Sequence, residues 1–480
     1  MTQTPDNVLL QTTANGCAKA YAPDVLPPLL DPAISSLVFD SPRALMKLVE
    51  QYGSSLNIVW PHILRRNVEA LRAVLNRHTA RFEIFYGAKV NKSPGLVRAA
   101  VEAAVGVDVS SIYEMRDALR AGIEPVMLCA TGPAKTRVFH AALIANAALI
   151  ALDSVEEFND LEMIVREIEP DRPTRVLLRY RPAASGTSRF GMGADDLLTC
   201  LQRLTRLNEW FSFEGFHFHL GGYGHESRVQ AVRELTGFIA AARDMGLDPK
   251  ILDIGGGLPV QYVDGKLYEA FMGAQCSGDY RNGKVPESFY PYGGPIGACQ
   301  WLDQFLASPC VDGVSIAGYL NEMRLTLAIE PGRSLADQTA VSVFRITRVK
   351  SLAADNVVIF VEGSSFSACE TWFASEFLVD PILVPAHVGS EHGEPPVRAY
   401  IAGHSCLDED VITNRLIQFQ RRPKAGDLLV YANTAGYQMD MLENEFHRHP
   451  VPRRISVTYD AAGGMEVSPD DRMEYRNDFE

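Results

Sequence analysis

The stretch that decides the fold reads Phe82-Glu83-Ile84-Phe85-Tyr86-Gly87-Ala88-Lys89, and a helical segment begins behind it at Ser93. Its first five residues are mostly aromatic and apolar, which predicts a strand, and Pro94 suits the first turn of the following helix. The same order of a short strand and a longer amphipathic helix recurs from about residue 56 to residue 330. This alternation predicts parallel strands joined by helices.

Working outward from this stretch, we expect seven or eight strands in the first part of the chain. They are 82–86, 107–109, 126–128, 149–152, 175–179, 213–219, 251–254 and 325–329. This number predicts a parallel α/β barrel, with a doubly wound sheet as the alternative. After residue 335 the pattern changes to short strands without long helices, at 340–347, 356–361, 397–402, 427–431 and 454–459.

The sequence therefore predicts two domains, a barrel over residues 56–335 and a mostly antiparallel β domain over residues 336–480. Within the barrel range, residues 276–300 are rich in Gly, Pro and Tyr and show no clear period. We interpret this stretch as an insertion. A surface loop and a lid or subunit contact both stay open for it.

The composition narrows the class of protein. The chain has 480 residues, of which 47% are hydrophobic and 22% charged, and this excludes a disordered or collagen-like chain. Its net charge of −14 argues against a surface for nucleic acid or for an anionic membrane, because phosphate contacts need clustered Lys and Arg. Small molecules are therefore the expected partners.

No stretch of the sequence predicts export or a membrane span. The most apolar run, residues 138–152, contains His140 and Asn146 and is shorter than the roughly 20 apolar residues that a span needs. Residues 1–23 lack the basic leader and apolar run of a secretory signal. The eight cysteines form no CxxC pair, which fits reduced thiols. We expect a cytoplasmic protein.

Residues able to do chemistry gather where the predicted strands end. Lys89 follows strand 82–86, His219 ends strand 213–219 and Glu330 follows strand 325–329. Three glycines, Gly255, Gly256 and Gly257, follow strand 251–254. Because barrels of this kind build their sites at the carboxyl ends of the strands, we expect these residues to lie close together.

Lys89 is the most informative of these residues. At the end of an apolar strand, burial disfavours the ammonium form, and the amine becomes nucleophilic enough to trap an aldehyde cofactor as a Schiff base. Taken alone, this position leaves a solvated surface lysine open. The glycines let backbone N–H groups approach a phosphate, and Glu330 near Arg333 can hold a ring nitrogen in its protonated form.

Two histidines, His217 and His219, lie two residues apart on an expected strand and therefore face the same way. Such a pair can ligate a metal, but no third ligand with recognisable spacing lies near it, so we expect no metal site. A ring stacked on a flat cofactor is the use that we favour for one of them.

Seven motifs resemble, in the same order, those of the fold-type III pyridoxal phosphate decarboxylases, the group of diaminopimelate, ornithine and arginine decarboxylases. They lie at residues 85–91, at 106–111 with Glu114, at 188–191, 215–221, 253–257, 330–333 and 406–410. The matches run from residue 85 to about residue 447, which is roughly three quarters of the chain.

This resemblance implies an alanine-racemase-like TIM (β/α)8 barrel joined to a C-terminal, mostly antiparallel β domain, to which residues 1–55 also contribute. It implies a lyase that uses pyridoxal 5'-phosphate. Lys89 forms the internal aldimine with the cofactor, His219 stacks on the pyridine face and Glu330 pairs with the pyridinium nitrogen.

The resemblance also implies the remaining contacts. The phosphate is held by Gly255, Gly256, Gly257, the backbone of Gly332 and Arg333, and Tyr437, while Asp108 and Arg179 support the lysine and the ring. Cys406 comes from the partner subunit and protonates the carbanion, as a general acid on one face. The expected assembly is therefore a homodimer with two shared active sites, with no nucleic acid or membrane partner.

Departures from the family pattern bear on the substrate. Gly222 stands where the family usually has a serine, and Leu407 stands where it often has an acidic residue that reaches the far end of the substrate. Asp408, Glu409 or Asp410 are the candidates to replace that contact. Residues 369–373 hold no arginine to grip a distal carboxylate. We therefore expect a non-standard amino acid as the substrate.

Two other functions stay open. The first is an amino-acid racemase or epimerase on the same fold, but such relatives usually place an arginine at the ring nitrogen, and Glu330 favours decarboxylation. The second is a non-catalytic, decarboxylase-like regulator. Such a protein is expected to lose the lysine or the cysteine, and Lys89 and Cys406 both stand at the matched places.

Overall fold

The computed structural model describes residues 25–290, 292, 294–352, 357–367, 375–386, 395–442 and 446–470. The chain divides into two compact units. The barrel unit comprises residues 59–260, 296–339 and 455–480, and the sheet unit comprises residues 1–58, 261–295 and 340–454. The predicted ranges 56–335 and 336–480 differ from this division, because 261–295 groups with the sheet strands and 455–480 groups with the barrel.

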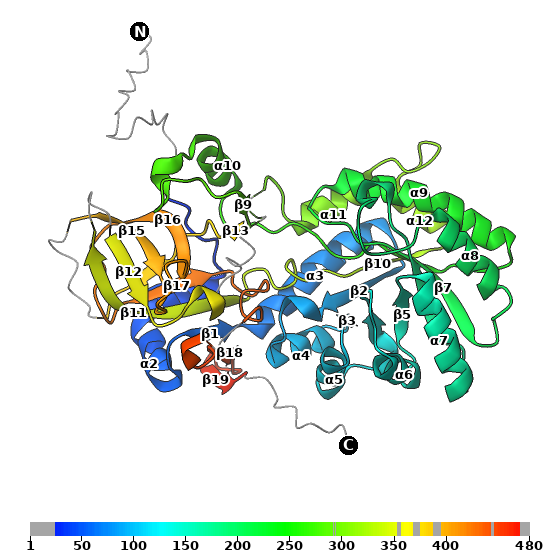
Figure 1. The fold of residues 1–480 in the computed structure, drawn as a ribbon, viewed down its shortest axis with the longest axis horizontal. Helices are drawn as coiled ribbons and strands as arrows, with labels where there is room; N and C mark the ends of the chain where they lie inside the picture. The colour runs from blue at the N-terminus through cyan, green and yellow to red at the C-terminus, as the bar shows by residue number, and fades with distance from the viewer. Residues whose placement is uncertain are drawn as a thin grey trace, which may run out of the picture. The chain divides into compact units, whose positions relative to one another are not determined.

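Eight parallel strands close into a barrel in the order β10-β2-β3-β4-β5-β6-β7-β8 (Figure 1). They are β2 (Phe82–Gly87), β3 (Gly106–Val109), β4 (Leu128–Ala130), β5 (Leu149–Leu152), β6 (Thr174–Arg179), β7 (Phe211–His217), β8 (Ile251–Asp253) and β10 (Thr326–Ile329). The closed order confirms the predicted (β/α)8 barrel and excludes the doubly wound sheet.

Helices follow the barrel strands along the chain and surround them (Figure 1). They are α3 (Pro61–His78), α4 (Pro94–Glu102), α5 (Ile112–Arg120), α6 (Arg137–Ala145), α7 (Val155–Ile168), α8 (Ala194–Leu204), α9 (His225–Asp244), α11 (Ala298–Ala307) and α12 (Ile316–Glu322). Four of them begin after Ser93, Ser111, Thr136 and Ser154, whose side-chain oxygens accept the N–H of the third residue on. These caps satisfy N–H groups that the helices leave unbonded.

The interior of the barrel is filled with side chains. A buried cluster from six of the eight strands contains Phe85, Cys129, Leu149, Ala151, Leu177, Ile251 and Ala328. Such layers make the barrel a packed core rather than a pore, so chemistry is confined to its carboxyl-terminal end. None of the described helices is long and apolar enough to cross a membrane.

Two predicted strands differ from the structure at their ends. Residues 125–127 form a 3-10 turn (η3, Pro125–Met127), and β4 begins only at Leu128. Strand β7 ends at His217 rather than His219, because the chain leaves the sheet once Phe218 N–H has donated to the Asp253 carbonyl at 2.9 Å. His217 and His219 therefore do not share one strand as predicted.

The sheet unit holds β strands in the order β16-β15-β12-β11-β1, with β17 on β11 and β14 on β17. They are β1 (Leu56–Val59), β11 (Ala340–Ser351), β12 (Val357–Val361), β14 (Ile382–Val384), β15 (Val397–Ala402), β16 (Val411–Phe419) and β17 (Leu428–Ala432). Helices α1 (Pro32–Ser35), α2 (Pro42–Tyr52) and α10 (Gly265–Ala274) also belong to this unit. All of the pairs are antiparallel except β12 with β15, among those whose register is described, so this sheet is mostly antiparallel as expected.

The predicted insertion packs into the sheet unit. Tyr280, Tyr290 and Tyr292 are buried, and the rings of Tyr290 and Tyr292 lie against Phe377. A short strand, β9 (Ser288–Phe289), pairs in parallel with β13 (Ser375–Glu376). The described part of residues 276–300 is therefore held by an aromatic core rather than lying loose on the surface.

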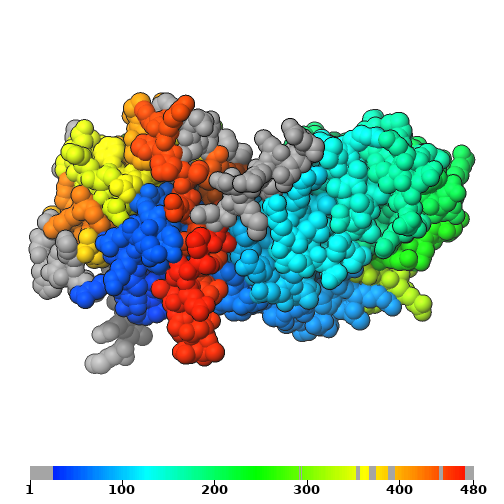
Figure 2. Space-filling view, turned by 90° about the horizontal axis from the view of Figure 1, so that it is seen from below, coloured from blue at the N-terminus to red at the C-terminus, as the bar shows by residue number. Residues whose placement is uncertain are grey.

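The C-terminal hairpin, β18 (Arg453–Tyr459) and β19 (Met465–Pro469), returns the chain to the barrel unit. Figure 2 shows it in red against the blue of the first barrel helices. The carboxylate of Asp470 accepts the N–H of Gly95 at 2.8 Å and the hydroxyl of Ser93. This carboxylate therefore closes the N-terminal end of α4, where negative charge is stabilising.

Candidate active site

A pocket of about 570 Å³ opens at the carboxyl ends of the barrel strands, within the size range of small-molecule sites. Its lining is Lys89, Ser110, Thr131, Gly132, Pro133, Ala134, Lys135, Arg179, Ser185, Ser188, Arg189, Phe190, His217, His219, Gly221 and Glu330. The structure thus brings together Lys89, Arg179, His219 and Glu330, which the sequence placed at separate strand ends.

Lys89 lies in a 3-10 turn directly after β2, and its side chain is about one third exposed. Its Nζ donates to Asp108 Oδ2 on β3 at 3.3 Å, and Thr131 Oγ1 donates to Asp108 Oδ1 at 2.7 Å. Burial and the nearby Glu330 raise the pKa of Asp108, while Lys89 and Thr131 oppose the rise. Asp108 therefore orients the amine of Lys89 toward the pocket.

Glu330 follows β10 and is almost fully buried at 2% exposure. Its N–H donates to the Gly255 carbonyl at 3.0 Å, which fixes the backbone. Its Oε1 makes no hydrogen bond, although His217 Nε2 lies 3.3 Å away. Burial raises the pKa of Glu330, and the charges of Lys89 and Arg179 partly oppose this. A buried carboxylate oxygen without a hydrogen bond needs a donor that a ligand can supply.

Asp253, the last residue of β8, is a site residue that sequence reasoning missed. It is fully buried, and its Oδ1 accepts the N–H of Gly255 at 2.8 Å. Burial and the neighbouring Glu330 raise its pKa well above the ordinary value, which favours the protonated form of this carboxyl. The signal that could have found it is its place at the head of the glycine run.

Both histidines are neutral in the structure. Burial lowers the pKa of His217 and His219 well below the ordinary value, and Arg179 and Lys89, respectively, add to the effect. His219 lies beyond the strand end, and its Nδ1 accepts the N–H of Gly256 at 3.1 Å. This bond keeps the ring of His219 at the edge of the pocket, while His217 lies behind Glu330.

The three glycines form a turn that no other residue could make. Gly255 and Gly257 have φ angles of +67° and +81°, in the left-handed region that favours glycine. A Cβ at position 256 would lie 2.6 Å from the Glu330 carbonyl oxygen. The N–H groups of Gly255 and Gly256 donate to Asp253 and His219, so within the described part of the chain the N–H of Gly257 is the donor of this turn that stays available to an anion.

Arg228 on α9 holds this turn from behind and was also missed by sequence reasoning. Its Nη2 donates to the carbonyls of Leu220, Gly222 and Gly256 at 2.8, 3.1 and 3.2 Å, and its Nη1 donates to Gly224 at 3.0 Å. Burial lowers its pKa to about 10. No motif marks this arginine, because its partners are backbone carbonyls.

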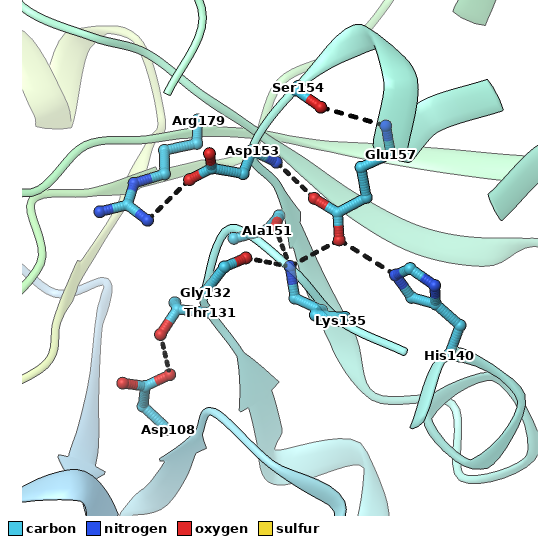
Figure 3. Close-up of polar contacts among 10 residues, drawn as sticks. All are labelled: Asp108, Thr131, Gly132, Lys135, His140, Ala151, Asp153, Ser154, Glu157 and Arg179. Carbon is cyan, nitrogen blue, oxygen red and sulfur yellow. Dashed lines mark hydrogen bonds and ion pairs between the residues drawn. The ribbon is translucent and has the colours of Figure 1, made fainter. Parts of the chain in front are cut away.

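A buried polar network supports the floor of the pocket (Figure 3). Lys135 Nζ donates to the carbonyls of Gly132 and Ala151 and to Glu157 Oε1, at 2.9, 2.7 and 2.8 Å. The same Glu157 oxygen lies 3.0 Å from His140 Nε2. Lys135 and Glu157 are nearly inaccessible, so each charge depends on the other.

The side chain of Arg179, at the end of β6, is connected to the same polar network. Its Nη1 donates to Asp153 Oδ1 at 2.8 Å, and its guanidinium lies 4.8 Å from the centroid of the Phe190 ring (Figure 3 shows the Asp153 contact). Asp153 N–H in turn donates to Glu157 Oε2 at 2.7 Å. The floor network and the pocket arginine are thus one connected set.

Gly332 and Arg333 lie after Glu330 in the loop that follows β10. A Cβ at position 332 would clash with the side chain of Val90, so the loop packs directly on the turn that carries Lys89. Arg333 Nη1 reaches Tyr223 Oη at 3.5 Å. The backbone of this loop therefore lies close to the lysine, as the predicted phosphate contact requires.

The remaining predicted residues belong to the sheet unit. Cys406 and Asp408 are exposed in the loop between β15 and β16, and Leu407 is 40% exposed. Tyr437 has a φ of +75° in the turn after β17. Their roles at the active site stay predictions.

Asp410 departs from its predicted role as a substrate contact. It is buried, and its Oδ1 accepts the N–H and the hydroxyl of Ser365 at 2.7 and 3.0 Å. Its Oδ2 accepts the N–H of Ser405 at 2.9 Å. Both oxygens are thus used to fix the loop that carries Cys406. Residues 369–373, where a distal arginine was sought, lie outside the described residues.

Two buried groups of three side chains bring possible metal ligands within 4.8 Å of one another. They are Asp108 with Cys129 and Glu330, and His217 with Asp253 and Glu330. Burial raises the pKa of the Cys129 thiol well above its ordinary value, so the sulfur stays protonated. Both groups share Glu330, and we assign them to the pocket described above.

The residues present fit pyridoxal 5'-phosphate. The pocket offers a primary amine on Lys89 and the buried carboxylate of Glu330, and the glycine turn, which leaves no room for a Cβ at position 256, follows β8 next to the backbone of Glu330. These match the cofactor's aldehyde, its protonated ring nitrogen and its phosphate.

Comparison with known proteins gives the same assignment. Residues 62–274 match the family model described as "Pyridoxal-dependent decarboxylase, pyridoxal binding domain". The chain is 55% identical to the uncharacterized protein y4yA of Sinorhizobium fredii, over 93% of this chain and 96% of that protein. It is 24% identical to diaminopimelate decarboxylase of Escherichia coli K12, over 85% of this chain and 90% of that enzyme.

The fold agrees with a solved structure of the same group. Diaminopimelate decarboxylase from M. jannaschii, crystallised with L-lysine, superposes with a TM-score of 0.70 at 16% identity, covering 89% of this chain and 91% of that one. The fold, with its barrel and sheet unit, and the match to the family model therefore indicate the same group of proteins. The chain belongs to the fold-type III pyridoxal phosphate-dependent amino-acid decarboxylases, a family of lyases.

Proposed function

We propose that the protein removes the α-carboxylate of a non-standard amino acid as carbon dioxide, at a site built on Lys89 and Glu330 and completed by Cys406 of a partner subunit. The observation that carries this proposal is the buried carboxylate of Glu330, which lines the same pocket as the Lys89 amine. A carboxylate in this place favours decarboxylation over racemisation, because it keeps a pyridine nitrogen protonated.

When bound, pyridoxal phosphate supplies an aldehyde that condenses with amines and a ring that accepts the electron pair left by carbon dioxide. Lys89 holds the cofactor through its Nζ and yields that place to the substrate amine. Asp108, 3.3 Å away, keeps the released amine near the reacting centre, where it can take or return a proton.

Glu330 is the residue that would pair with the ring nitrogen of the cofactor. Burial raises the pKa of Asp253 more strongly than that of Glu330, which favours the negative charge on Glu330. Burial also lowers the pKa of His217, which disfavours a competing cation beside this carboxylate. His219, also neutral, is the ring that we assign to the cofactor face.

Phosphate binding is assigned to backbone and to one side chain of the sheet unit. Gly255 and Gly256 shape the turn, with their N–H groups bound to Asp253 and His219, and the N–H groups of Gly257, Gly332 and Arg333 are the proposed backbone donors, which add no net charge. Tyr437 is the proposed side-chain donor. The turn geometry of the glycines and the packing of Gly332 on Val90 support this assignment.

The substrate differs from a simple diamine precursor. Leu407 offers an apolar side chain where an acidic one would bind a distal amine, and Asp410 is used within its own loop. Asp408 and Glu409 are the remaining exposed carboxylates of this loop, and we assign Asp408 to the far end of the substrate. Arg189 lines the barrel pocket, while Lys135 and Arg179 are paired with Glu157 and Asp153, so Arg189 is the cation that favours a substrate with a further anionic group.

The test is a panel of basic, acidic and aminoacyl-conjugated amino acids, followed for carbon dioxide and for optical rotation. We expect gas release with at least one member. Rotation change without gas would replace the proposal with a racemase, and neither signal, with cofactor bound, would favour the non-catalytic regulator.

Cofactor attachment has its own test. The purified protein should show a visible absorbance band of lysine-bound cofactor, and Lys89→Ala should remove it. A band that survives this substitution would mean that another amine holds the cofactor. Lys92, three residues away, provides the matched control, because Lys92→Ala should keep the band.

The shared site of a homodimer is tested by mixing two inactive variants. Lys89→Ala and Cys406→Ala each damage a different half of every site, so a mixed dimer contains one intact site. Random mixing of equal amounts should restore about a quarter of the wild-type activity. No recovery after verified subunit exchange would contradict a site shared between protomers.

A further inference from the structure

The loop that carries Cys406 also places a histidine against its sulfur. His447 Nε2 lies 3.2 Å from Cys406 Sγ, and the backbone N–H of Cys406 donates to the same Nε2 at 3.3 Å. Both residues are exposed and belong to the sheet unit, although 41 positions separate them in the chain. This is a thiol–imidazole contact within hydrogen-bond reach.

The hydrogen bond from the backbone defines which nitrogen faces the thiol. Because Nε2 accepts the Cys406 N–H, the neutral ring carries its own proton on Nδ1. The nitrogen beside the sulfur is therefore the basic one. The backbone of His447 has a φ of +59°, in the left-handed region that a residue other than glycine rarely adopts.

The loop around this pair is built to hold it. Asp410 fixes Ser405, the residue before Cys406, and His404 Nδ1 accepts the N–H of Gly363 at 3.1 Å. The ring of His404 stacks on His449 with centroids 3.7 Å apart, and His449 lies edge-on to His447 at 6.2 Å. The segment before Cys406 and the segment after His447 are thus in contact with each other through the rings of His404 and His449.

We propose that His447 is the positioning residue of Cys406, and that it restores the proton that the thiol gives to the substrate carbon. This inference rests on the proposed function of Cys406 as the general acid. Nothing in the sequence motifs suggests it, because residue 447 lies at the end of the matched region and far from the cysteine in the chain.

The proton balance is complete with water as the source. When carbon dioxide leaves, its former bond pair stays with the α-carbon and forms a new C–H bond as the Cys406 S–H bond breaks. The thiolate then takes a proton from Nε2 of His447, which has gained one from solvent. One solvent proton is used for each carbon dioxide released, and no oxidant or reductant is required.

The first test measures the reactivity of Cys406 beside His447 in the absence of turnover. In the holoenzyme, iodoacetamide alkylation is followed by mass spectrometry for each cysteine peptide, since the thiolate is the reactive form. His447→Gln should slow the alkylation of Cys406 severalfold and leave Cys299, in the barrel unit, unchanged. An unchanged Cys406 rate in this variant would overturn the proposal.

The second test reads turnover and separates the two proposals. With an amino acid that the wild type decarboxylates, His447→Gln should lower kcat by about 10- to 100-fold, at the lower end of what a positioned acid or base contributes, with little change in KM. Added imidazole should restore part of kcat in His447→Gly, but not in Cys406→Ala.

The possible failures are distinguishable. If Cys406→Ala keeps full activity, the general-acid role of the cysteine is wrong, whatever the alkylation rates are. If Cys406→Ala is impaired but His447→Gln and His447→Gly turn over normally, only the role of His447 is wrong. Cofactor absorbance, expected to be unchanged in all three variants, verifies that the barrel site is intact.

Discussion

Single residues at this site are distinguished by their environment more than by their type. Glu330 and Asp253 are both buried carboxyls at neighbouring strand ends, but Asp253 accepts a backbone N–H and has the more strongly raised pKa. The difference in pKa favours the negative charge on Glu330. Two like groups with different proton affinity are the usual means of dividing acid and base roles.

Gly256 gives a prediction at this scale. Gly256→Ala adds a Cβ that would lie 2.6 Å from the Glu330 carbonyl oxygen, so the turn or the strand end must shift. An overpacking cost of about 1–3 kcal/mol corresponds to a cofactor affinity roughly 5- to 150-fold weaker. Titration of the apoprotein with pyridoxal phosphate, followed by absorbance, measures this.

The matched control is Gly237→Ala in α9, where no atom lies within 4 Å of the added Cβ. This variant should bind the cofactor as the wild type does. Equal affinity in both alanine variants would show that the turn at Gly256 has room that the structure does not indicate.

Residue-scale prediction from sequence succeeded where a strand end and a motif coincided. Lys89, Arg179, His219 and Glu330 line one pocket, as their places at strand ends predicted. Arg228 and Asp253 were not predicted as site residues, because their partners are backbone groups that only the folded chain brings near. Asp410 was misplaced, since spacing cannot reveal that both of its oxygens bind the chain itself.

At the scale of helices and strands, contacts between consecutive strand–helix units of the barrel position the site. The loop after β4 supplies Lys135, and the first turn of α7 supplies Glu157, so their ion pair joins two units of the barrel. His140 on α6 approaches the same carboxylate. Such a pair connects the helical layer to the pocket floor.

This ion pair gives the second prediction. Lys135→Met should destabilise the protein by about 3–5 kcal/mol, because it leaves the Glu157 carboxylate buried without its charge partner. The double variant Lys135→Met/Glu157→Gln should recover much of the loss. Urea unfolding of both variants and of Glu157→Gln measures the coupling. A double variant no more stable than Lys135→Met would contradict the pairing.

The segment 261–295 gives a prediction about the turn that carries Tyr437, the proposed side-chain donor to the phosphate. Tyr290 Oη donates to the carbonyl of Gly436 at 3.0 Å, next to Tyr437. Removing this bond in Tyr290→Phe costs about 0.5–1.5 kcal/mol, and we expect cofactor affinity to fall roughly 2- to 10-fold. Tyr319→Phe is the control, because the Tyr319 hydroxyl is buried without a hydrogen bond.

Strand and helix alternation predicted the barrel elements well, but their ends less so. The run from 213 to 219 looks like one strand, whereas β7 ends at His217 when the chain turns toward the glycine loop. In the sheet unit, β16 was not predicted, because its Thr413-Asn414-Arg415 interrupts the apolar pattern. Arg415 is buried there against Asp380, a pairing that sequence cannot reveal.

At the scale of the whole molecule, stability depends on pH through Asp337. Its Oδ1 is buried without a hydrogen bond, and burial raises its pKa to about 7. Between the ordinary value of 3.8 and about 7, the unfolded chain ionises this group while the folded chain keeps it protonated. Stability from this group is therefore present at low pH and is lost as pH rises through that window.

Asp337→Asn should remove this dependence, since an amide stays neutral. We expect the melting temperature of the variant to exceed that of the wild type at pH 8, and the difference to shrink toward pH 5. Differential scanning calorimetry across this range measures it. A difference that is constant with pH would show that Asp337 is already ionised in the folded protein.

The order of strands in the barrel has a consequence for the folding of the protein during its synthesis. Glu330 follows β10, which pairs with β2, the strand before Lys89, and with β8, the strand before the glycine turn. The lysine, the carboxylate and the glycines that we propose to hold the cofactor thus meet at the junction of the first and last strands. A nascent chain that ends before β10 has the lysine and the glycines but no closed barrel to hold them. On the proposed function, acquisition of the cofactor reports that the barrel has been completed, and the expected visible band marks finished folding during synthesis.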